Sequence, residues 1–475
     1  MVERKIELLS PAKNLECGIE AINHGADAVY IGASKFGARS AAVNSMQDIE
    51  QLSTYAHKFN AHVYVAVNTI LKDNELDDAQ SLIWDLYHAG ADAIIIQDMG
   101  ILQLDLPPIA LHASTQTDNR TVEKVQFLEK AGFSQIVLAR ELNLEQIRNI
   151  TSQVHVPIEV FVHGALCVSY SGQCYISQAM CGRSANRGEC AQYCRLPYDL
   201  LDADGKIIAK NKHLLSLKDL NLSNHLQELL DAGVSSFKIE GRLKDVSYVK
   251  NVTAYYRQQL DKILSQSKEY KKSSSGKITY TFEPNLEKSF HRGSTSYFLK
   301  GRNLDMTSFD TPKSKGEYIG KPKEISKNFI VLNSLLEFHN GDGFCFLDEQ
   351  GEFCGFRANK VDGNRLYPTE MPVISKNTDI YRNLDINFTQ NLSKKTAERK
   401  MAVDVLFSET KSGFLLQIKD EDNHVINYDC PTNKELAKNK EKADENINGN
   451  FFAAVSCWMF GVRWADARTT QARSL

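Results

Sequence analysis

Residues 24–32 read HGADAVYIG, and this stretch decides the fold. A helix ends at a glycine, and a short apolar strand follows directly. The same order returns as AGADAIII at 89–96, AGFSQIVL at 131–138 and AGVSSFKI at 232–239. Amphipathic segments precede the strands, for example at 75–88 and 122–130. A repeated unit of helix, glycine and strand predicts an α/β fold with a parallel sheet.

Further apolar strands fit between these repeats, at 6–9, 63–67, 109–112 and 158–162. Eight strands alternating with helices favour a closed (β/α)8 barrel of the TIM type over residues 1–264, with an open doubly wound sheet as the alternative. In such a barrel the chemistry lies at the C-terminal ends of the strands. Polar residues stand at those ends here: Ser10, Lys13, Asn68, Gln97, Asp98, Ser114 to Gln116, Arg140, Glu141, His163, Glu240 and Arg242.

A cysteine-rich insertion, residues 163–195, follows the seventh strand and is expected to cover the barrel mouth. It holds five of the ten cysteines, at positions 167, 174, 181, 190 and 194. Their spacing differs from paired zinc knuckles and from the ferredoxin run. Three interpretations remain: separate structural cysteines, a zinc ion held by four thiolates, and an iron–sulfur cluster. The spacing alone does not separate zinc from a cluster.

The bulk composition is that of a soluble globular protein with two or three domains. The net charge of -3 gives no global preference for nucleic acid, so RNA binding requires local patches. No apolar run is long enough to span a bilayer, and the N-terminus lacks the apolar region of a signal peptide. We therefore expect a cytoplasmic protein with reduced thiols and no membrane partner.

After the barrel, residues 265–277 are predicted to form a flexible linker. Short alternating strands then predict a small β-barrel domain at 278–399. Within it, basic residues interleave with Phe290, Tyr297 and Phe298, which fits RNA contacts and equally a solvated surface. Residues 400–447 are interpreted as the start of a third, partial α+β domain. The tail at 448–475 holds two of the three tryptophans and no lysine, and is interpreted as anomalous, with a truncated or frame-shifted end.

Several long motifs resemble the collagenase-like peptidase family U32. They are ELLSPAKNLECGIEAINHGADAVYIG at 7–32, FGARSAAVN at 36–44, EVFVHGALCVSYSGQCYIS at 159–177, GRSANRGECAQYCR at 182–195 and FKIEGR at 237–242. The resemblance covers the whole barrel and implies the family's domain order, with a further family domain starting at 400–447. Members include proteins first named proteases and oxygen-independent RNA hydroxylases, which act on a transfer RNA uridine or a ribosomal RNA cytidine. Quinone-related members take their last cysteine ligand further downstream, where this chain has none before Cys345.

The resemblance also implies a cofactor and partners. Cys167, Cys174, Cys190 and Cys194 match the ligands of a [4Fe–4S] cluster, while Cys181 is an extra cysteine. RNA and a small anionic co-substrate are the implied partners, with prephenate as the oxygen donor. We assign catalytic roles to His163, Arg187, Glu240 and Arg242, and co-substrate or cofactor binding to Arg39 and Arg140. Arginine side chains suit this task because they bind carboxylates and phosphates with two parallel hydrogen bonds.

Two other functions stay open. A peptidase is the first, although the sequence has neither an HExxH helix nor a GxSxG elbow. His163, four residues before Cys167, offers the histidine that a cysteine nucleophile needs. A zinc-stabilised, non-catalytic RNA-binding factor is the second. The leading hypothesis is an iron–sulfur-dependent RNA hydroxylase.

Overall fold

The computed structural model describes residues 3–37, 44–302 and 304–433, residues 439, 441–442 and 445, and the backbone of 460–464. The chain forms two compact units. The first comprises Met1–Ser273 and Thr281–Thr396, and the second comprises Ser274–Tyr280 and Ala397–Leu475. No helix among the described residues combines the length and the apolar character needed to cross a bilayer.

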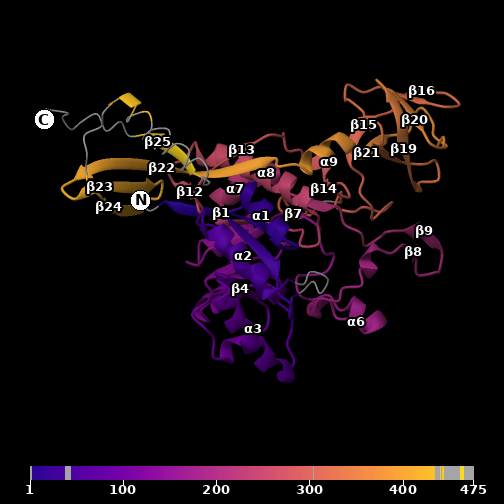
Figure 1. Ribbon diagram of the computed structural model, residues 1–475. Coiled ribbons are helices and arrows are strands. Elements are labelled where there is room, and N and C mark those ends of the chain that lie inside the picture. Colours follow the sequence, from indigo (N-terminus) through magenta and orange to yellow (C-terminus); the bar gives the residue numbers. More distant parts are fainter. Residues whose placement is uncertain are drawn as a thin grey trace. The chain divides into compact units, whose positions relative to one another are not determined.

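A closed barrel of eight parallel strands dominates the first unit (Figure 1). The strands are β1 (Arg4–Ala12), β2 (Ala28–Gly32), β3 (His62–Val67), β4 (Ala93–Ile96), β5 (Ala110–Ala113), β6 (Gln135–Val137), β7 (Ile158–Gly164) and β11 (Ser236–Ile239). Strand β11 pairs in parallel with both β1 and β7, which closes the ring. The predicted barrel is therefore confirmed, and the open sheet is excluded.

Helices α1 (Leu15–Asn23), α2 (Met46–His57), α3 (Leu76–His88), α4 (Val122–Lys130), α5 (Leu144–Thr151), α7 (Leu226–Asp231) and α8 (Val246–Leu264) alternate with the strands. The glycines of the four repeats, at 25, 90, 132 and 233, all have positive φ, between 83° and 110°. A left-handed residue just past a helix lets the last carbonyls be satisfied and turns the chain toward the next strand. This is why the repeated glycine marks each strand start.

The barrel interior is partly polar. Lys238 donates from Nζ to Oε1 of the buried Glu159 at 2.6 Å, and Gln135 donates to Oε2 of the same carboxylate at 2.7 Å. Tyr64 donates to Glu7, the pKa of which is raised by burial. Buried charges persist only where they are paired or hydrogen-bonded, so this network fixes the orientation of the strands beneath the mouth.

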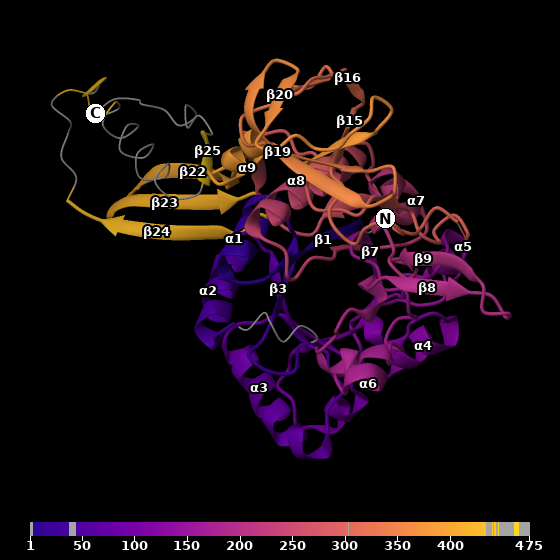
Figure 2. The same ribbon diagram turned by 90° about the vertical axis from the view of Figure 1, so that its right-hand side faces the viewer.

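The cysteine-rich insertion after β7 contains helix α6 (Ile176–Cys181), followed by the hairpin of β8 (Tyr198–Leu201) and β9 (Ile207–Lys212). The hairpin turns at Asp204 and Gly205, and Gly205 has φ of 80°. Helix α6 and the hairpin lie on the same side of the barrel (Figures 1 and 2). Strand β10 (Asp219–Asn221) then pairs with the end of β7, and β14 (Ser294–Thr295) pairs with β10.

A curled antiparallel sheet of seven strands follows, in the order β15-β21-β18-β19-β20-β17-β16. The strands are β15 (Glu317–Gly320), β16 (Pro322–Ile325), β17 (Ile330–Leu332), β18 (Gly343–Leu347), β19 (Phe353–Asp362), β20 (Arg365–Pro368) and β21 (Ile380–Leu384). The two edge strands of this sheet, β15 and β16, are consecutive in the chain and are separated only by Lys321. The sheet therefore curls until its two edges meet at this residue. This arrangement agrees with the predicted small β-barrel.

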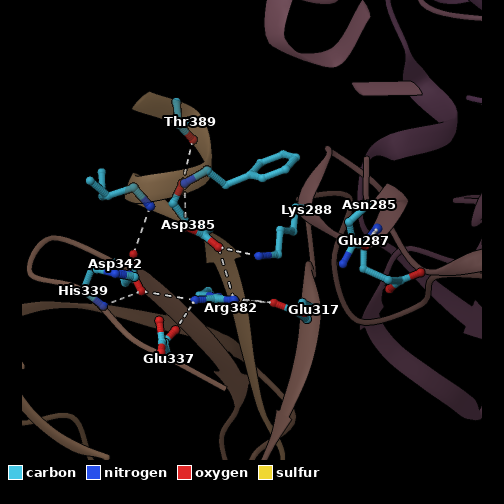
Figure 3. Close-up of polar contacts among 12 residues, drawn as sticks. Asn285, Glu287, Lys288, Glu317, Glu337, His339, Asp342, Arg382, Asp385 and Thr389 are labelled. Atoms are coloured by element: carbon cyan, nitrogen blue, oxygen red, sulfur yellow. Dashed lines mark hydrogen bonds and ion pairs between the residues drawn. The ribbon is translucent and has the colours of Figure 1, made fainter. Parts of the chain in front are cut away.

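One buried arginine joins three carboxylates of the curled sheet, and a lysine links one of them to the segment before the sheet (Figure 3). Arg382 donates from Nη2 to Glu317 at 2.6 Å, and lies 3.4 Å from Asp342 and 3.2 Å from Asp385. Lys288, in the short helix η7 (Leu286–Lys288), donates to the same Asp385 at 2.7 Å. A cation shared by three carboxylates holds the ends of three sheet segments in one register.

The second unit differs from the predicted boundaries. Strand β13 (Lys277–Tyr280), expected in the small β-barrel, pairs instead with β22 (Ala397–Thr410). Strands β23 (Gly413–Asp420) and β24 (Val425–Pro431) extend this sheet. Within the expected linker, β12 (Tyr270–Lys272) pairs with β1, because its backbone groups find an edge to bond. Of the tail, only the backbone of β25 (Phe460–Trp464) is described, paired with β22.

Candidate active site at the barrel mouth

Amide side chains occupy one part of the mouth, where β3, β4 and β5 end. Asn68 donates from Nδ2 to Oε1 of Gln116 at 2.6 Å. Gln97 donates to the backbone carbonyl of Gln116 at 3.3 Å. The sequence placed these residues at strand ends, and the barrel brings them into direct contact.

A charged group occupies the part of the mouth after β6 and β11. Arg140 donates from Nη2 to Oε2 of Glu240 at 2.8 Å, and the two side chains are only 15% and 16% exposed. The guanidinium also lies 3.8 Å from the ring centroid of Phe161. Burial raises the pKa of Tyr30 well above its usual range, and the charges of Glu240, Arg242 and Arg140 all act on this phenol. Three predicted residues therefore gather above Tyr30, while Arg39 lies outside the described residues.

Four of the five cysteines of the insertion lie close together. A hydrogen bond from Cys167 lowers the pKa of Cys174 to about 6, while burial and the charges of Cys190 and Cys194 act in the opposite direction. The same hydrogen bond, together with burial, raises the pKa of Cys167. Burial raises the pKa of Cys194, with Cys167 and Cys190 adding to it. Each of the four thiols thus interacts with others of the set.

Cys181 has different partners. Its Sγ donates to the carbonyl oxygen of Ser177 at 3.3 Å, and its hydrogen bond with the phenol of Tyr193 raises the pKa of that tyrosine. The position of Cys181 at the exposed end of α6 accounts for this difference. Cys181 therefore has hydrogen-bond partners outside the group of four thiols.

Arg195 clamps the two ends of the cysteine stretch. It donates from Nη2 to the carbonyl oxygen of Leu166 at 2.9 Å, and from Nη1 to Ser216 and to the carbonyl of Leu217. Burial lowers its pKa. Since Leu166 precedes Cys167 and Arg195 follows Cys194, this one side chain sets the distance between the first and last thiols. Sequence reasoning assigned it no role, although it ends a family motif.

The middle of the stretch rests on the barrel rim. Ser171 donates its backbone N–H to Glu141 at 2.8 Å and its hydroxyl to the same carboxylate at 3.1 Å. Gly172 has φ of 75°, and a Cβ there would lie 2.0 Å from the carbonyl oxygen of Gln116. Only glycine permits this approach, so the loop between Cys167 and Cys174 is seated directly on the turn that follows β5.

Arg187 takes part in a tether. Its guanidinium makes two parallel hydrogen bonds to Glu75, of 2.9 and 2.6 Å, and a third to the carbonyl of Ile70 at 2.6 Å. The Arg187 bonds hold the pKa of Glu75 down to about 2. The predicted catalytic arginine thus ties the cysteine stretch to the loop between β3 and α3. Among the described residues its hydrogen bonds go to Glu75 and Ile70, and its catalytic role stays a prediction.

His163 is buried at the end of β7. Its Nδ1 lies 3.3 Å from the hydroxyl of Tyr256, and its ring packs against those of Tyr256 and Tyr248. Burial lowers the pKa of the imidazole to about 3, so it is neutral at physiological pH. A neutral histidine bonded to a tyrosine does not match the histidine that activates a cysteine nucleophile.

Residues 13–308 match the family model of peptidase family U32. The chain belongs to peptidase family U32. It is 50% identical to a 23S rRNA 5-hydroxycytidine synthase of Escherichia coli, over 93% of this chain and 69% of that protein. It is 33% identical to a tRNA hydroxylation protein of Bacillus subtilis, over 78% of this chain and 91% of that protein. A collagenase of Porphyromonas gingivalis is 31% identical, over 63% of this chain and 74% of that protein.

Cys167, Cys174, Cys190 and Cys194 are the candidate ligands of a metal centre. Thiolates around one zinc ion lie ~3.8 Å apart, given tetrahedral Zn–S bonds of about 2.3 Å. Among the described residues, potential ligand atoms gather within 4.8 Å of one another at His339 with Asp342 and Asp385, and at Asp420 with Asp422 and His424, but not at the cysteines. The cysteine thiols therefore fit a metal centre by donor type, and this donor type suits both a zinc ion and an iron–sulfur cluster.

Proposed function

We propose that this U32 protein hydroxylates RNA, and that its product is 5-hydroxycytidine in 23S ribosomal RNA. The observation that carries the proposal is the 50% identity to the synthase that makes this nucleoside at position 2501, sustained over 93% of the chain. The matched length includes the barrel, the cysteine stretch and the curled sheet. Transfer RNA uridine is the second candidate substrate, supported by the lower identity to the tRNA hydroxylation protein.

For the cofactor, we propose a [4Fe–4S] cluster held by Cys167, Cys174, Cys190 and Cys194. The donor set supports this, because the four thiols interact with one another while Cys181 bonds elsewhere. The low pKa of Cys174 makes one thiolate ready for metal without a further base. When bound, such a cluster supplies a redox-active, Lewis-acidic centre at the barrel mouth.

The residues of the mouth would hold the substrates. Arg140 and Arg242 are proposed to bind the carboxylates of a small anionic co-substrate, with prephenate as the oxygen donor of a reaction that does not use molecular oxygen. Glu240 holds Arg140 in place through the 2.8 Å ion pair and limits its movement. The part of the mouth with Asn68, Gln97 and Gln116 offers amide donors and acceptors, which suit the polar edge of a nucleobase.

Peptide hydrolysis and zinc-stabilised RNA binding are the competing functions. The similarity to a collagenase supports peptide hydrolysis. Against it, His163 bonds to Tyr256 and not to a cysteine thiol. Different measurements identify the two functions. A peptidase would release fragments from gelatin, whereas a zinc-stabilised RNA-binding protein would carry one zinc ion per chain and leave RNA unmodified.

The proposal is tested by deleting the gene in its own host and measuring hydroxylated nucleosides in ribosomal and transfer RNA by mass spectrometry. We expect 5-hydroxycytidine to disappear from 23S rRNA and to return when the chain is supplied again. Unchanged hydroxylation in both RNA classes would refute the proposal. Loss of a hydroxylated uridine from transfer RNA instead would reassign the substrate.

A further inference from the structure

Tyr297 and Phe298 form an aromatic stack with an unusual backbone. Their ring centroids are 4.0 Å apart, with an angle of 11° between the planes. Consecutive side chains of an extended strand point to opposite sides, so neighbours in sequence do not normally stack. Tyr297 has φ of 52°, in the left-handed region, and this turn places both rings on the same side. For a bulky aromatic residue this backbone is strained, and such strain persists where the surroundings fix it.

The surroundings of this turn do fix it. The N–H of Tyr297 donates to the hydroxyl of Thr295 at 3.0 Å, and Thr295 belongs to β14, which pairs with β10. On the other side, the N–H of Leu144 donates to the carbonyl oxygen of the buried Leu299 at 3.0 Å. The stack is therefore anchored both to the added strands and to the loop that carries Arg140 and Glu141.

The stack borders the proposed reaction site. Tyr297 is only 7% exposed. Burial raises its pKa to about 12, with contributions from the charges of Glu141, Cys167 and Tyr170 and an opposing one from Arg140. The charges of Cys167 and Arg140 thus reach Tyr297, and the Leu144–Leu299 hydrogen bond joins its turn to the loop that carries Arg140. Its phenol stays protonated at neutral pH.

Phe298 is the outer member of the stack. It is half-buried, and the guanidinium carbon of the exposed Arg302 lies 5.9 Å from its ring centroid. The neighbouring Phe290, by comparison, is held between Lys244 at 3.3 Å and Arg292 at 4.8 Å from its centroid. Phe298 thus combines a ring that is backed by Tyr297 with an exposed cation, Arg302, near its own ring. Proteins that act on nucleobases hold them on such rings.

We propose that Phe298, backed by Tyr297, is the platform on which the base of the RNA substrate stacks at the barrel mouth. Arg302 would contact the same base or the adjoining phosphate. The proposal rests on the proposed RNA hydroxylation and names the residues that present the base to it. The strained turn at Tyr297 exists, on this account, to keep the platform rigid before RNA arrives.

The test uses the full chain, purified without oxygen, and a synthetic single-stranded RNA centred on position 2501 of 23S rRNA. Phe298→Leu keeps an apolar side chain and removes the aromatic face, and Phe298→Tyr keeps it. We expect the Kd for this RNA to rise about tenfold in Phe298→Leu and to stay near the wild-type value in Phe298→Tyr. Iron content is measured in parallel and should not change.

Phe127→Leu is the matched control. Phe127 is 57% exposed on α4 and also has a cation near its ring, with Nζ of Lys124 5.8 Å from the centroid. Its replacement should leave RNA binding unchanged. Equal Kd values for the Phe298→Leu variant, the Phe127→Leu variant and the wild type would overturn the platform.

A crosslink provides a second readout that does not depend on a variant folding. The same RNA, with 5-iodocytidine at the target position, is irradiated with the wild-type chain, and the modified residue is identified by mass spectrometry. We expect the crosslink at Phe298 or Tyr297, and a crosslink confined to other segments would contradict the proposal. If the wild-type chain hydroxylates RNA and the Phe298→Leu variant binds RNA as tightly as the wild type, only the platform proposal is refuted. Wild-type chain that does not modify RNA at all defeats the proposed function as well.

Discussion

Arg195 donates a hydrogen bond from Nη2 to the carbonyl oxygen of Leu166 at 2.9 Å, and so joins the two ends of the cysteine stretch. Twenty-eight positions of chain are bracketed by this contact, including all five cysteines of the insertion. Cys167 and Cys194, the first and last thiols inside this contact, interact electrostatically with each other. The two ends of the cysteine stretch are therefore held together by hydrogen bonds from one half-buried cation, Arg195.

Replacing Arg195 should loosen the cysteine stretch, residues 167–194. Arg195→Lys keeps the charge but loses the fork that reaches Leu166, Leu217 and Ser216 together. We expect a loss of about 3 kcal/mol in unfolding free energy and a lower iron content, because buried hydrogen bonds to a charged group are lost. Urea unfolding and iron analysis measure both. Arg183→Lys, at an exposed position of the same stretch, is the control and should resemble the wild type.

Alanine variants of two glycines in the stretch distinguish the cost of a steric clash from the cost of backbone strain in the unfolding free energy. Gly172→Ala forces a Cβ to within 2.0 Å of the Gln116 carbonyl oxygen, whereas Gly182→Ala places it where nothing lies within 4 Å. Both have positive φ, of 75° and 72°. We expect Gly182→Ala to cost about 1 kcal/mol, from strain alone, and Gly172→Ala to cost about 3 kcal/mol and to displace the loop. Equal unfolding free energies for the two variants would show that the loop is not seated on the turn that follows β5.

The Arg187–Glu75 pair gives a pH-dependent contribution. The folded pKa of Glu75, about 2, lies below the ~4.3 of an unfolded glutamate. The stabilisation is therefore complete above pH ~4.3 and is lost as the pH falls toward 2. Both side chains are partly exposed, so Glu75→Gln should cost about 1 kcal/mol near neutral pH and almost nothing at about pH 2. Urea unfolding at a series of pH values checks this, and a pH-independent difference would contradict it.

Serine variants of the cysteines should divide into two classes. Cys174→Ser removes the thiolate of lowest pKa from the group of four, and we expect iron and sulfide to be lost from the anaerobically purified protein. Cys181→Ser removes only contacts to Ser177 and Tyr193, so iron content should remain at the wild-type level. Loss of iron from Cys181→Ser, with iron retained in Cys174→Ser, would reverse the proposed ligand set.

Local pattern in the sequence was enough for the barrel. The glycines at 25, 90, 132 and 233 end helices and start strands, and both features depend on residues adjacent in the chain. The number of strands favoured a closed ring over an open sheet, and the pairing of β11 with both β1 and β7 decided it. Residues of the mouth, such as Arg140 and Glu240, could be placed for the same reason, since parallel strand ends meet at one rim.

Pairings across long stretches of chain could not be predicted. Arg187 finds Glu75, which is 112 positions away, and no local pattern distinguishes this ion pair from a catalytic arginine. Strand β13 joins β22 across more than a hundred residues, which moved a domain boundary. The grouping of four cysteines was implied by family resemblance and not by spacing, because the loop is irregular and its shape depends on contacts such as that of Gly172 with Gln116.

RNA hydroxylation is tested most directly by complementation. An Escherichia coli strain that lacks its own 23S rRNA 5-hydroxycytidine synthase is supplied with this chain, and position 2501 is analysed by mass spectrometry of the isolated rRNA fragment. We predict that the wild-type chain restores 5-hydroxycytidine at that position and that Cys174→Ser does not. An unmodified cytidine with the wild-type chain, expressed and loaded with iron, would contradict the account.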